Sequence, residues 1–409
     1  MRKIKFLPII SILILVSLVD LYVFQGVKVL TNNSSDPLKE GIQTGYWILS
    51  LGLIISFFVG FYKSIAAGRI TLLFNTIFNA FLTLFVTKLV FILFLFTEDL
   101  IRLMVSIFNE GQFQDRAMLM SQVALFISGI PFFAFLFGVT KGKYNYKVRR
   151  NVLYFDDLPA AFDGFKIAQI SDVHAGSFNR KKPVQKGVDL ILQQKPDVLL
   201  FTGDLVNNHS EEIVPWIDMF KAIELPCGKF SVLGNHDYGD YIRWASAEDK
   251  SRNLATLKKY HAEMGFKLLL DEHVELEKDG EYIQVLGVEN WGLGFGQRGN
   301  LAKALNGADG RDFKVLLSHD PTHCESEVKK HPSKIHLTLS GHTHGMQFGI
   351  EALGIKWSPV KYRYPHWAGL KEENGRYLYI NRGFGFLGFS GRIGIWPEIT
   401  IIELRKTKA

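Results

Sequence analysis

The sequence predicts a membrane region of four helices followed by an α/β domain. The first 140 of its 409 residues are strongly apolar, and most of the charged residues lie beyond Lys141. From about residue 151, short β-rich runs alternate with helical stretches, which is typical of an α/β fold. We therefore divide the chain into a transmembrane region (1–140), a basic juxtamembrane linker (141–150) and a folded domain (151–409).

Four apolar stretches in the first region are long enough, or nearly so, to cross a bilayer as helices, which takes about 17–25 residues. They cover residues 6–24, 45–62, 70–96 and 117–140. The first follows basic residues as a signal peptide would, but no small-residue cleavage pattern follows it, so we expect it to be retained. Pro131 is expected to kink the fourth span.

Basic residues beside the spans predict the orientation. If the N-terminus lies inside, ten Lys and Arg residues flank the spans on the inner side and four lie in the outer loops. The inner set is Arg2, Lys3, Lys5, Lys63, Arg69, Lys141, Lys143, Lys147, Arg149 and Arg150, and the outer set is Lys28, Lys39, Arg102 and Arg116. Because cytoplasmic loops carry the basic excess, we expect a multi-pass protein of the cell (inner) membrane with a cytoplasmic C-terminal domain.

Two charged residues, Asp20 and Lys88, lie inside the predicted spans. We expect Lys88 to extend its amine toward the membrane surface and Asp20 to contact headgroups. The alternatives are an ion pair that stabilises the bundle, or a role in transport or sensing. The segment 97–116, with charged and apolar residues at helical spacing, is expected to lie along the outer membrane surface.

The strands of the later domain are almost continuous apolar runs, as in sheets covered on both faces. They cover residues 165–170, 198–201, 230–233, 313–317 and 335–339. Residues 274–277 and 282–288 flank Asp279-Gly280 and predict a hairpin, and further strands are expected at 377–380 and 399–404. This pattern favours a mixed sheet or two packed sheets over a purely parallel one.

Short motifs rich in metal ligands follow several of these strands. In order they are Asp172-Val-His174, Gly203-Asp204, Gly234-Asn235-His236-Asp237, a lone His319 and Gly341-His342-Thr-His344. Glycine beside a ligand lets backbone approach a cation closely, and open α/β sheets bind ligands beyond their strand ends. Three carboxylates, one amide and five imidazoles are enough for two ions, and ligands of this hardness suit Mn, Fe or Zn. Two ions about 3.5–4 Å apart are the standard arrangement for in-line attack on phosphorus.

These motifs, in this order, resemble those of the calcineurin-like metallophosphoesterases. The resemblance is close over about 165–345, and residues 317–321, 341–347 and 396–399 are similar to the membrane-anchored branch of that family. It implies a four-layer α/β-β/α sandwich and a metal-dependent phosphoesterase. Because every ligand of the family pattern is present, the resemblance favours an enzyme over a membrane receptor or scaffold.

The resemblance also implies a role for each residue. It places Asp172, His174 and His344 on the first metal, Asn235, His319 and His342 on the second, and Asp204 as the bridge between them. His236 is the candidate that protonates or stabilises the leaving oxygen, and Asp237 the candidate that holds the His236 imidazole in its productive tautomer. Asp320 either supports the metal ligands or begins a turn.

Two further segments bear on the substrate. Residues 356–367 alternate aromatic and basic side chains, and Phe384, Phe386, Leu387, Phe389 and Arg392 follow among glycines. Both segments suit a lip for a phosphorylated, partly apolar substrate, or equally packed loops that close the sheet. The stretch 294–299 matches G-x-G-x-x-G but does not directly join a strand to a helix, so we expect a flexible surface loop.

The expected partners are membrane lipids and a phosphorylated substrate, with no nucleic acid. The net charge of +7 is modest and is not concentrated on a basic helix, and two cysteines do not make a disulfide framework. A lipid-linked phosphate ester is expected, for which the family suggests UDP-2,3-diacylglucosamine. The alternative is a tethered phosphodiesterase or phosphatase that acts on soluble nucleotides or phosphorylated proteins.

Overall fold

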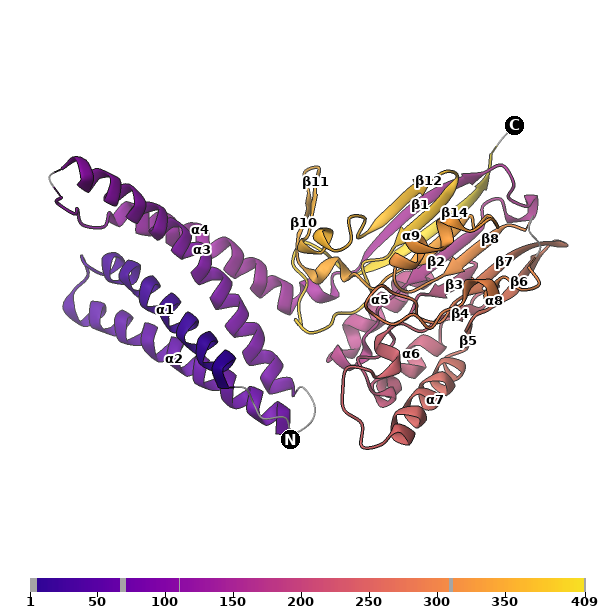
Figure 1. The fold of residues 1–409 in the computed structure, drawn as a ribbon, viewed down its shortest axis with the longest axis horizontal. Coiled ribbons are helices and arrows are strands. Elements are labelled where there is room, and N and C mark those ends of the chain that lie inside the picture. Colours follow the sequence, from indigo (N-terminus) through magenta and orange to yellow (C-terminus); the bar gives the residue numbers. More distant parts are fainter. Residues whose placement is uncertain (1–5, 67–70, 110, 309–311, 408–409) are drawn as a thin grey trace. The chain divides into compact units, whose positions relative to one another are not determined.

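The structure is a computed structural model that describes residues 6–66, 71–109, 111–308 and 312–407 (Figure 1). The chain forms two compact units, Met1–Val139 and Thr140–Ala409. Each is described by itself below.

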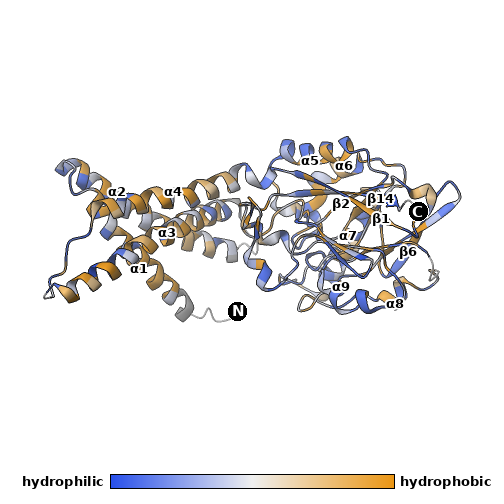
Figure 2. Ribbon diagram, turned by 90° about the horizontal axis from the view of Figure 1, so that it is seen from above, coloured by the Kyte–Doolittle hydropathy of each residue, from blue (hydrophilic) through white to orange (hydrophobic). Residues whose placement is uncertain are grey.

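The first unit consists of long apolar helices. They are α1 (Phe6–Leu30), α2 (Asp36–Ala66), α3 (Leu72–Phe108) and α4 (Met118–Thr140). Within the described residues, these four helices are long and apolar enough to cross a membrane. Figure 2 shows hydrophobic residues along most of their length, and only 17–28% of the residues in the most apolar stretches are buried inside the protein. Apolar residues that face outward need lipid around them, so the chain is a multi-pass membrane protein.

The helix α3 is longer than the predicted span. It continues to Phe108, so residues 97–108 form the last turns of the same helix and not a separate element. The charges in this part of α3 have partners that allow the helix to continue. Arg116 lies 2.7 Å from Asp99 and 3.2 Å from Glu98, and Arg102 lies 2.8 Å from Asp99.

The charged residues in the middle of the bundle form a pair. Lys88 on α3 donates to Oδ1 of Asp20 on α1 and, at 2.8 Å, to the hydroxyl of Ser50 on α2. Tyr46 and Ser50 each donate to the same Asp20 oxygen at 2.8 Å, and Asp20 is 1% exposed. The expectation that the two charges reach the membrane surface separately is therefore wrong, and the ion pair is confirmed. An unpaired charge in an apolar medium costs several kcal/mol, which favours this pairing.

We predict that Lys88→Met strongly destabilises the membrane unit because it leaves Asp20 buried without a counter charge. The expected loss is about 3–5 kcal/mol. The double variant Asp20→Asn/Lys88→Met should lose less, because the amide still accepts from Tyr46 and Ser50 and carries no charge. Thermal unfolding in detergent micelles measures both. An equal loss in the single and double variants would contradict the prediction.

The second unit is built on two six-stranded sheets within the described part of the chain. The first has the order β1 (Lys147–Phe155), β14 (Glu398–Lys406), β2 (Lys166–Ile170), β3 (Val198–Phe201), β4 (Lys229–Ser231) and β5 (Phe266–Leu268). The second has the order β12 (Gly369–Glu373), β13 (Arg376–Ile380), β9 (Leu337–Ser340), β8 (Lys314–Leu317), β7 (Glu281–Gly287) and β6 (Glu272–Lys278). Both sheets are mixed, as expected, and β6 and β7 form the predicted hairpin. Because β1 begins at Lys147, the last four residues of the predicted linker 141–150 lie within the first sheet.

Alternation of side chains along the strands creates four layers. In β2, Ile167 belongs to the core between the two sheets, and its neighbour Ala168 belongs to the core under the first group of helices. In β7, Val285 faces the same central core, whereas Leu286 faces the second group of helices. The helices are α5 (Lys181–Gln193), α6 (Ile217–Lys221) and α7 (Ala247–Glu263) on the first sheet, with α8 (Leu301–Ala304) and α9 (Thr322–Ser326) on the second. The result is the expected α/β-β/α sandwich.

Candidate metal centre

Each ligand motif comes shortly after the carboxyl end of a strand. The first three motifs follow β2, β3 and β4, which are parallel neighbours in the first sheet. His319 and the last motif follow β8 and β9, which are parallel neighbours in the second sheet. Parallel strands within one sheet end at the same edge of that sheet. In this domain, the loops at these edges of the two sheets also contact one another. His342 and Asp172, 170 positions apart in the sequence, are in contact as a result.

Glycines in the motifs allow these loops to approach one another. A Cβ on Gly203 would lie 2.5 Å from the backbone nitrogen of Gly234, and a Cβ on Gly234 would lie 2.2 Å from Oδ1 of Asp204. A Cβ on Gly341 would lie 1.8 Å from Oγ of Ser171. Any side chain at these positions would push the loops apart. Atoms of the loops that carry the candidate ligands therefore occupy the space beside each glycine.

The backbone at most of the predicted ligands is left-handed. Five of the seven have positive φ angles: Asp172 (52°), His174 (46°), Asp204 (60°), His342 (68°) and His344 (49°). Such residues cost roughly 1–3 kcal/mol each and persist only where the surrounding structure holds them. Two backbone hydrogen bonds supply this restraint. The N–H of Asp172 donates to the carbonyl of Gly203 at 2.8 Å, and the N–H of His174 donates to the carbonyl of Asp204 at 3.1 Å. Strain concentrated at one edge of a sandwich is typical of a functional site.

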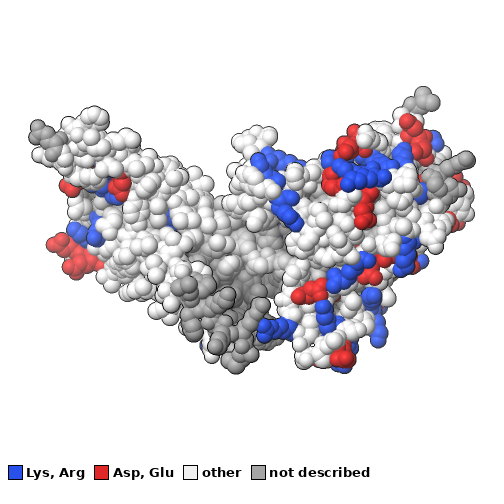
Figure 3. Space-filling view, viewed as in Figure 1, with Lys and Arg blue, Asp and Glu red and all other residues white. Residues whose placement is uncertain are grey.

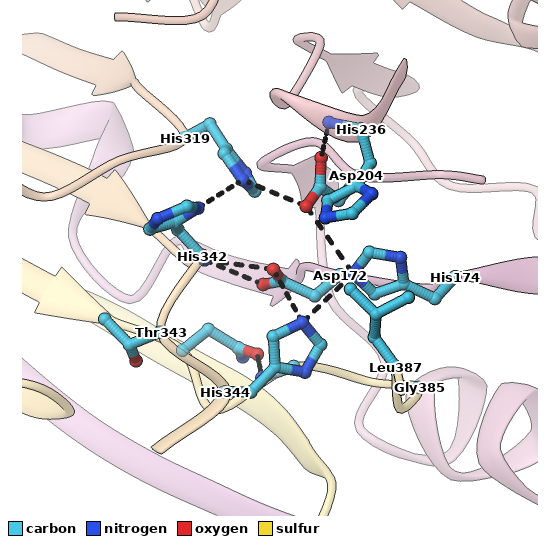
Figure 4. A network of polar contacts seen from close by, with 12 residues as sticks. Asp172, His174, Asp204, His236, His319, His342, Thr343, His344, Gly385 and Leu387 are labelled. Carbon is cyan, nitrogen blue, oxygen red and sulfur yellow. Dashed lines mark hydrogen bonds and ion pairs between the residues drawn. The ribbon is translucent and has the colours of Figure 1, made fainter. Parts of the chain in front are cut away.

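Two groups of ligand side chains point toward one another (Figure 4). In the first, Nε2 of His344 lies 3.0 Å from Nε2 of His174 and 3.2 Å from Oδ1 of Asp172. In the second, Nε2 of His319 lies 3.2 Å from Oδ2 of Asp204 and 3.2 Å from Nδ1 of His342. Oδ2 of Asp204 also lies 3.5 Å from Nε2 of His174. One carboxylate oxygen thus faces both groups, which is the position predicted for the bridge.

These side chains fit a pair of divalent cations. Within each group the ligand atoms lie within 4.8 Å of one another. Imidazole nitrogens and carboxylate oxygens that converge in a buried site bring lone pairs and negative charge together, and a cation compensates both. Asn235, the remaining predicted ligand, places its side-chain oxygen 3.1 Å from Nε2 of His319. The chain therefore has two candidate metal sites of the His/Asp type found in dinuclear metallophosphoesterases.

The carboxylate charges dominate the electrostatics of the centre. Burial alone would lower the pKa of His319, but the Asp204 carboxylate outweighs this and raises that pKa to about 10. Burial would raise the pKa of Asp204, but His319 and His236 hold it well below its usual range. Burial lowers the pKa of His342 to about 4. The Asp204 carboxylate thus favours positive charge beside it, which a bound cation would also supply.

His236 is positioned differently from the prediction. Its Nδ1 lies 2.9 Å from the carbonyl oxygen of Asn207, which fixes the tautomer with the proton on Nδ1. Its ring packs against Tyr241, with centroids 4.4 Å apart, and lies 5.0 Å from the ring of His174. The expected partner, Asp237, is engaged elsewhere. A backbone carbonyl from another loop leaves no local signal in the sequence, so the sequence does not indicate Asn207 as the partner of His236.

Asp237 instead holds the loop that carries Asp204. Its two oxygens accept from the backbone N–H groups of Asp204, Leu205, Val206 and Gly234 at 2.8–3.2 Å. Asp237 is fully buried, and burial, together with the Asp204 carboxylate, raises its pKa to about 7. Its role is to fix the position of Asp204, not to orient the imidazole of His236.

Asp320 both begins a turn and contacts a candidate metal ligand, as the two alternative predictions for it describe. Its Oδ1 accepts from the backbone and hydroxyl of Thr322 at 2.8 Å, which begins the turn into α9. Its Oδ2 lies 3.4 Å from Nε2 of His342 and accepts from the hydroxyl of Tyr364 at 3.3 Å. A carboxylate on the far nitrogen of a ligand imidazole orients the ring and raises its basicity. Tyr364, within the aromatic segment 356–367, therefore supports the centre from behind.

The structure excludes two residues from the expected substrate lip. Phe384 and Phe386 are fully buried in the core next to α5 and α6, so a lip role for them is wrong and the packed-loop alternative holds. Arg392 is also buried, and its guanidinium donates to the carbonyls of Gly383 and Gly385, whose loop contacts Asp172. An apolar residue between glycines has the same local sequence whether it is buried or exposed. Only the packing of the folded chain distinguishes the two cases.

The G-x-G-x-x-G stretch is a loop, as expected, but it also contacts the centre. The ring of Phe295 packs edge-on against His342 with centroids 4.4 Å apart. Arg298 pairs with Asp240 at 2.9 Å and lies over the ring of Tyr238, 4.1 Å from its centroid. Phe295 and Tyr241 thus border the candidate centre next to ligand residues from the two different sheets.

Comparison with known proteins agrees with this geometry. Residues 165–346 match the family model of the calcineurin-like phosphoesterases, and residues 3–143 match a model described as a probable calcineurin-like phosphoesterase transmembrane domain. The uncharacterized metallophosphoesterase YkuE of Bacillus subtilis is 29% identical over 256 residues, which cover 61% of this chain and 82% of that protein. The phosphodiesterase YaeI of Escherichia coli is 26% identical, over 63% of this chain and 87% of its own length. The transmembrane protein with metallophosphoesterase domain of Danio rerio is 26% identical, over 61% and 55%.

A two-sheet α/β sandwich with two His/Asp groups around one shared carboxylate is typical of the dinuclear metallophosphoesterases. The chain belongs to the calcineurin-like metallophosphoesterases with an N-terminal transmembrane domain, and it is a metal-dependent phosphoesterase.

We predict that Asp237→Asn weakens metal binding by about 10–100-fold, because the amide turns N–H groups toward the backbone donors that hold the Asp204 loop. Unfolding free energy should fall by about 1–3 kcal/mol for the unsatisfied donors. Metal titration by calorimetry and denaturant unfolding at pH 8 measure these effects. The matched control is Asp240→Asn in the same loop. It removes exposed ion pairs with Lys250 and Arg298 and is expected to change stability by less than about 1 kcal/mol. Equal effects of the two variants would refute the role of Asp237.

Proposed function

We propose that this metal-dependent phosphoesterase cleaves a phosphoester or pyrophosphate bond in a lipid-linked substrate at the cytoplasmic face of the inner membrane. The observation that carries the proposal is the pair of candidate metal sites in a chain with four membrane helices. UDP-2,3-diacylglucosamine, a diacylated nucleotide pyrophosphate, represents the substrate class. We expect the two ions to be Mn, Fe or Zn.

The chain's own residues define how the reaction is arranged. When bound, two divalent cations acidify a water and neutralise charge that develops on the phosphoryl oxygens. Asp172, His174 and His344 would hold one cation, Asn235, His319 and His342 the other, and Asp204 both. Asp204 is fixed from behind by Asp237, so its bridging oxygen is positioned before substrate arrives.

His236 is the group available to the leaving oxygen. The carbonyl of Asn207 holds its Nδ1 proton, so Nε2 is the nitrogen that can carry a proton to the substrate. The backbone N–H of His236 donates to Oδ1 of Asp204 at 2.8 Å, which ties the imidazole to the bridging residue. Packing against Tyr241 restricts the ring further. This restraint keeps Nε2 in place for proton transfer to the alkoxide or phosphate that departs.

The membrane helices favour a lipid-linked substrate, because a soluble substrate needs no anchor. The exposed part of the segment 356–367, with Lys361 and Tyr362, suits a phosphorylated amphipathic molecule. One observation favours the alternative of a tethered enzyme for soluble nucleotides or phosphorylated proteins: the buried positions of Phe384 and Phe386 remove two of the expected apolar contacts.

We predict that His236→Ala lowers kcat/KM by about 10²–10⁴ for an alkyl phosphodiester, whose leaving oxygen needs a proton. The loss should be much smaller for a nitrophenyl phosphodiester, whose leaving group departs as a stable anion. Steady-state kinetics on the two esters, with metal content measured for each sample, separate the roles. An equal loss on both esters with unchanged metal content would exclude proton donation by His236.

The substrate proposal predicts a preference of at least about tenfold in kcat/KM, or ~1.4 kcal/mol, for a lipid-linked pyrophosphate in mixed micelles over soluble nucleotides. Phosphate release from a panel of both kinds of substrate measures it. Asp204→Asn serves as the inactive control, since it removes the bridging charge. A preference for soluble nucleotides that does not depend on detergent or lipid would support the alternative function instead.

A further inference from the structure

A small hairpin stands apart from both large sheets. It consists of β10 (Ile350–Ala352) and β11 (Ile355–Trp357), which pair only with each other and project from the domain in Figure 1. It begins shortly after the ligand His344, and its base is tied to that region. The backbone nitrogen of Gly349 donates to the carbonyl of Ile393, and the hydroxyl of Ser358 donates to that of Gly345 at 2.8 Å.

The polar face of this hairpin contacts the domain. Glu351 accepts from Arg382 at 2.5 and 3.1 Å and from Arg149 at 2.5 Å. Lys356, directly opposite Glu351, donates to the carbonyl of Ala368 and lies over the ring of Trp367. The cross-strand pair of charged residues therefore attaches the hairpin to the domain.

The apolar face is consequently exposed. Side chains alternate along a strand, so the pairs Ile350–Trp357 and Ala352–Ile355 lie on the face opposite to Glu351 and Lys356. Ile350 and Ile355 are 50% and 54% exposed, and Leu353 at the tip is 100% exposed. A ribbon on a water-soluble surface normally has the reverse arrangement, with apolar residues against the core. This arrangement needs an apolar environment outside the domain.

The turn of the hairpin supports the same conclusion. Two other hairpins in the domain turn through Asp279-Gly280 and Asn374-Gly375, with both residues at positive φ. Asx-Gly is the usual pair for such turns. The β10–β11 turn has Leu353-Gly354, with Leu353 at φ 53°. Leucine is strained in this conformation. Because Leu353 is fully exposed, its side chain contributes no hydrophobic stabilisation to the domain. A contact of this side chain outside the domain explains its presence.

The bilayer itself is the environment within reach. Six residues, 141–146, separate the end of α4 from the start of β1, and six residues span at most about 20 Å. The domain therefore stays beside the membrane that contains α4. Lys361 and Arg363, both exposed, follow the hairpin, and Figure 3 shows an uncharged tip with Lys and Arg side chains below it. Apolar residues rimmed by basic ones match the acyl and anionic headgroup layers of a leaflet.

We propose that the apolar face and tip of the β10–β11 hairpin insert into the headgroup region of the bilayer that holds α1–α4. Because the hairpin base contacts the loop of His344, this insertion orients the candidate metal centre relative to the leaflet. The proposal depends on the membrane helices and not on which phosphate ester is cleaved.

The test uses the full chain with Cys227→Ala and Cys324→Ala, reconstituted into vesicles that contain anionic phospholipid. An environment-sensitive fluorophore is attached at Leu353→Cys or, as the matched control, at Asp279→Cys on the tip of the β6–β7 hairpin. Vesicles with lipids brominated near the headgroup end of the acyl chain should quench the label at 353 at least about twofold more than the label at 279. The emission of the label at 353 should also shift to the blue.

Three results would overturn the proposal. The first is equal, weak quenching at both tips. The second is a blue shift at 353 without lipid quenching that grows with protein density, since this indicates a second copy of the chain. The third is quenching at 353 that persists in the variant Ile350→Ser/Ile355→Ser, in which the apolar face is lost. Hydrolysis of a soluble aryl phosphodiester by each labelled chain confirms that the domain is folded.

Discussion

The candidate metal centre depends on one constraint, the position of the Asp204 carboxylate between two groups of candidate ligands, each of which combines residues from both sheets. Its Oδ2 lies 3.2 Å from His319 and 3.5 Å from His174. This position exists only because loops after β3 and β4 touch without side chains at Gly203 and Gly234. Asp237 then clamps the loop through backbone N–H groups. The left-handed backbone at the ligands is the strain that this close approach produces.

Both units of the chain contain buried ion pairs. In the membrane unit, Asp20 and Lys88 meet from different helices, and hydroxyls of Tyr46 and Ser50 share the carboxylate. In the enzyme unit, Arg382 lies between Glu351 and Glu398 in a buried pair of contacts. A low-dielectric surrounding makes an isolated charge costly, which favours a partner of opposite sign at both of these places. At the candidate metal centre, bound cations would compensate the charge of the Asp172 and Asp204 carboxylates.

The four candidate membrane helices and the proposed insertion of the β10–β11 hairpin would each hold the domain at a lipid surface. The helices would keep the domain near the bilayer through the short connection 141–146. A hairpin whose base contacts the loop of His344 would restrict that orientation. The two features together are compatible with hydrolysis of a headgroup that remains attached to its acyl chains.

The sequence by itself determined the apolar spans, the order of strands and helices, and the residues that converge on the candidate metal centre. These are local patterns: hydropathy over about 20 residues, and short motifs placed after strands. The tertiary structure alone decided that Asp20 pairs with Lys88, that Asn207 and not Asp237 orients His236, and that Phe384 and Phe386 are core. Each of these depends on which residues far apart in the chain are packed together, and a local pattern contains no information about the opposite partner.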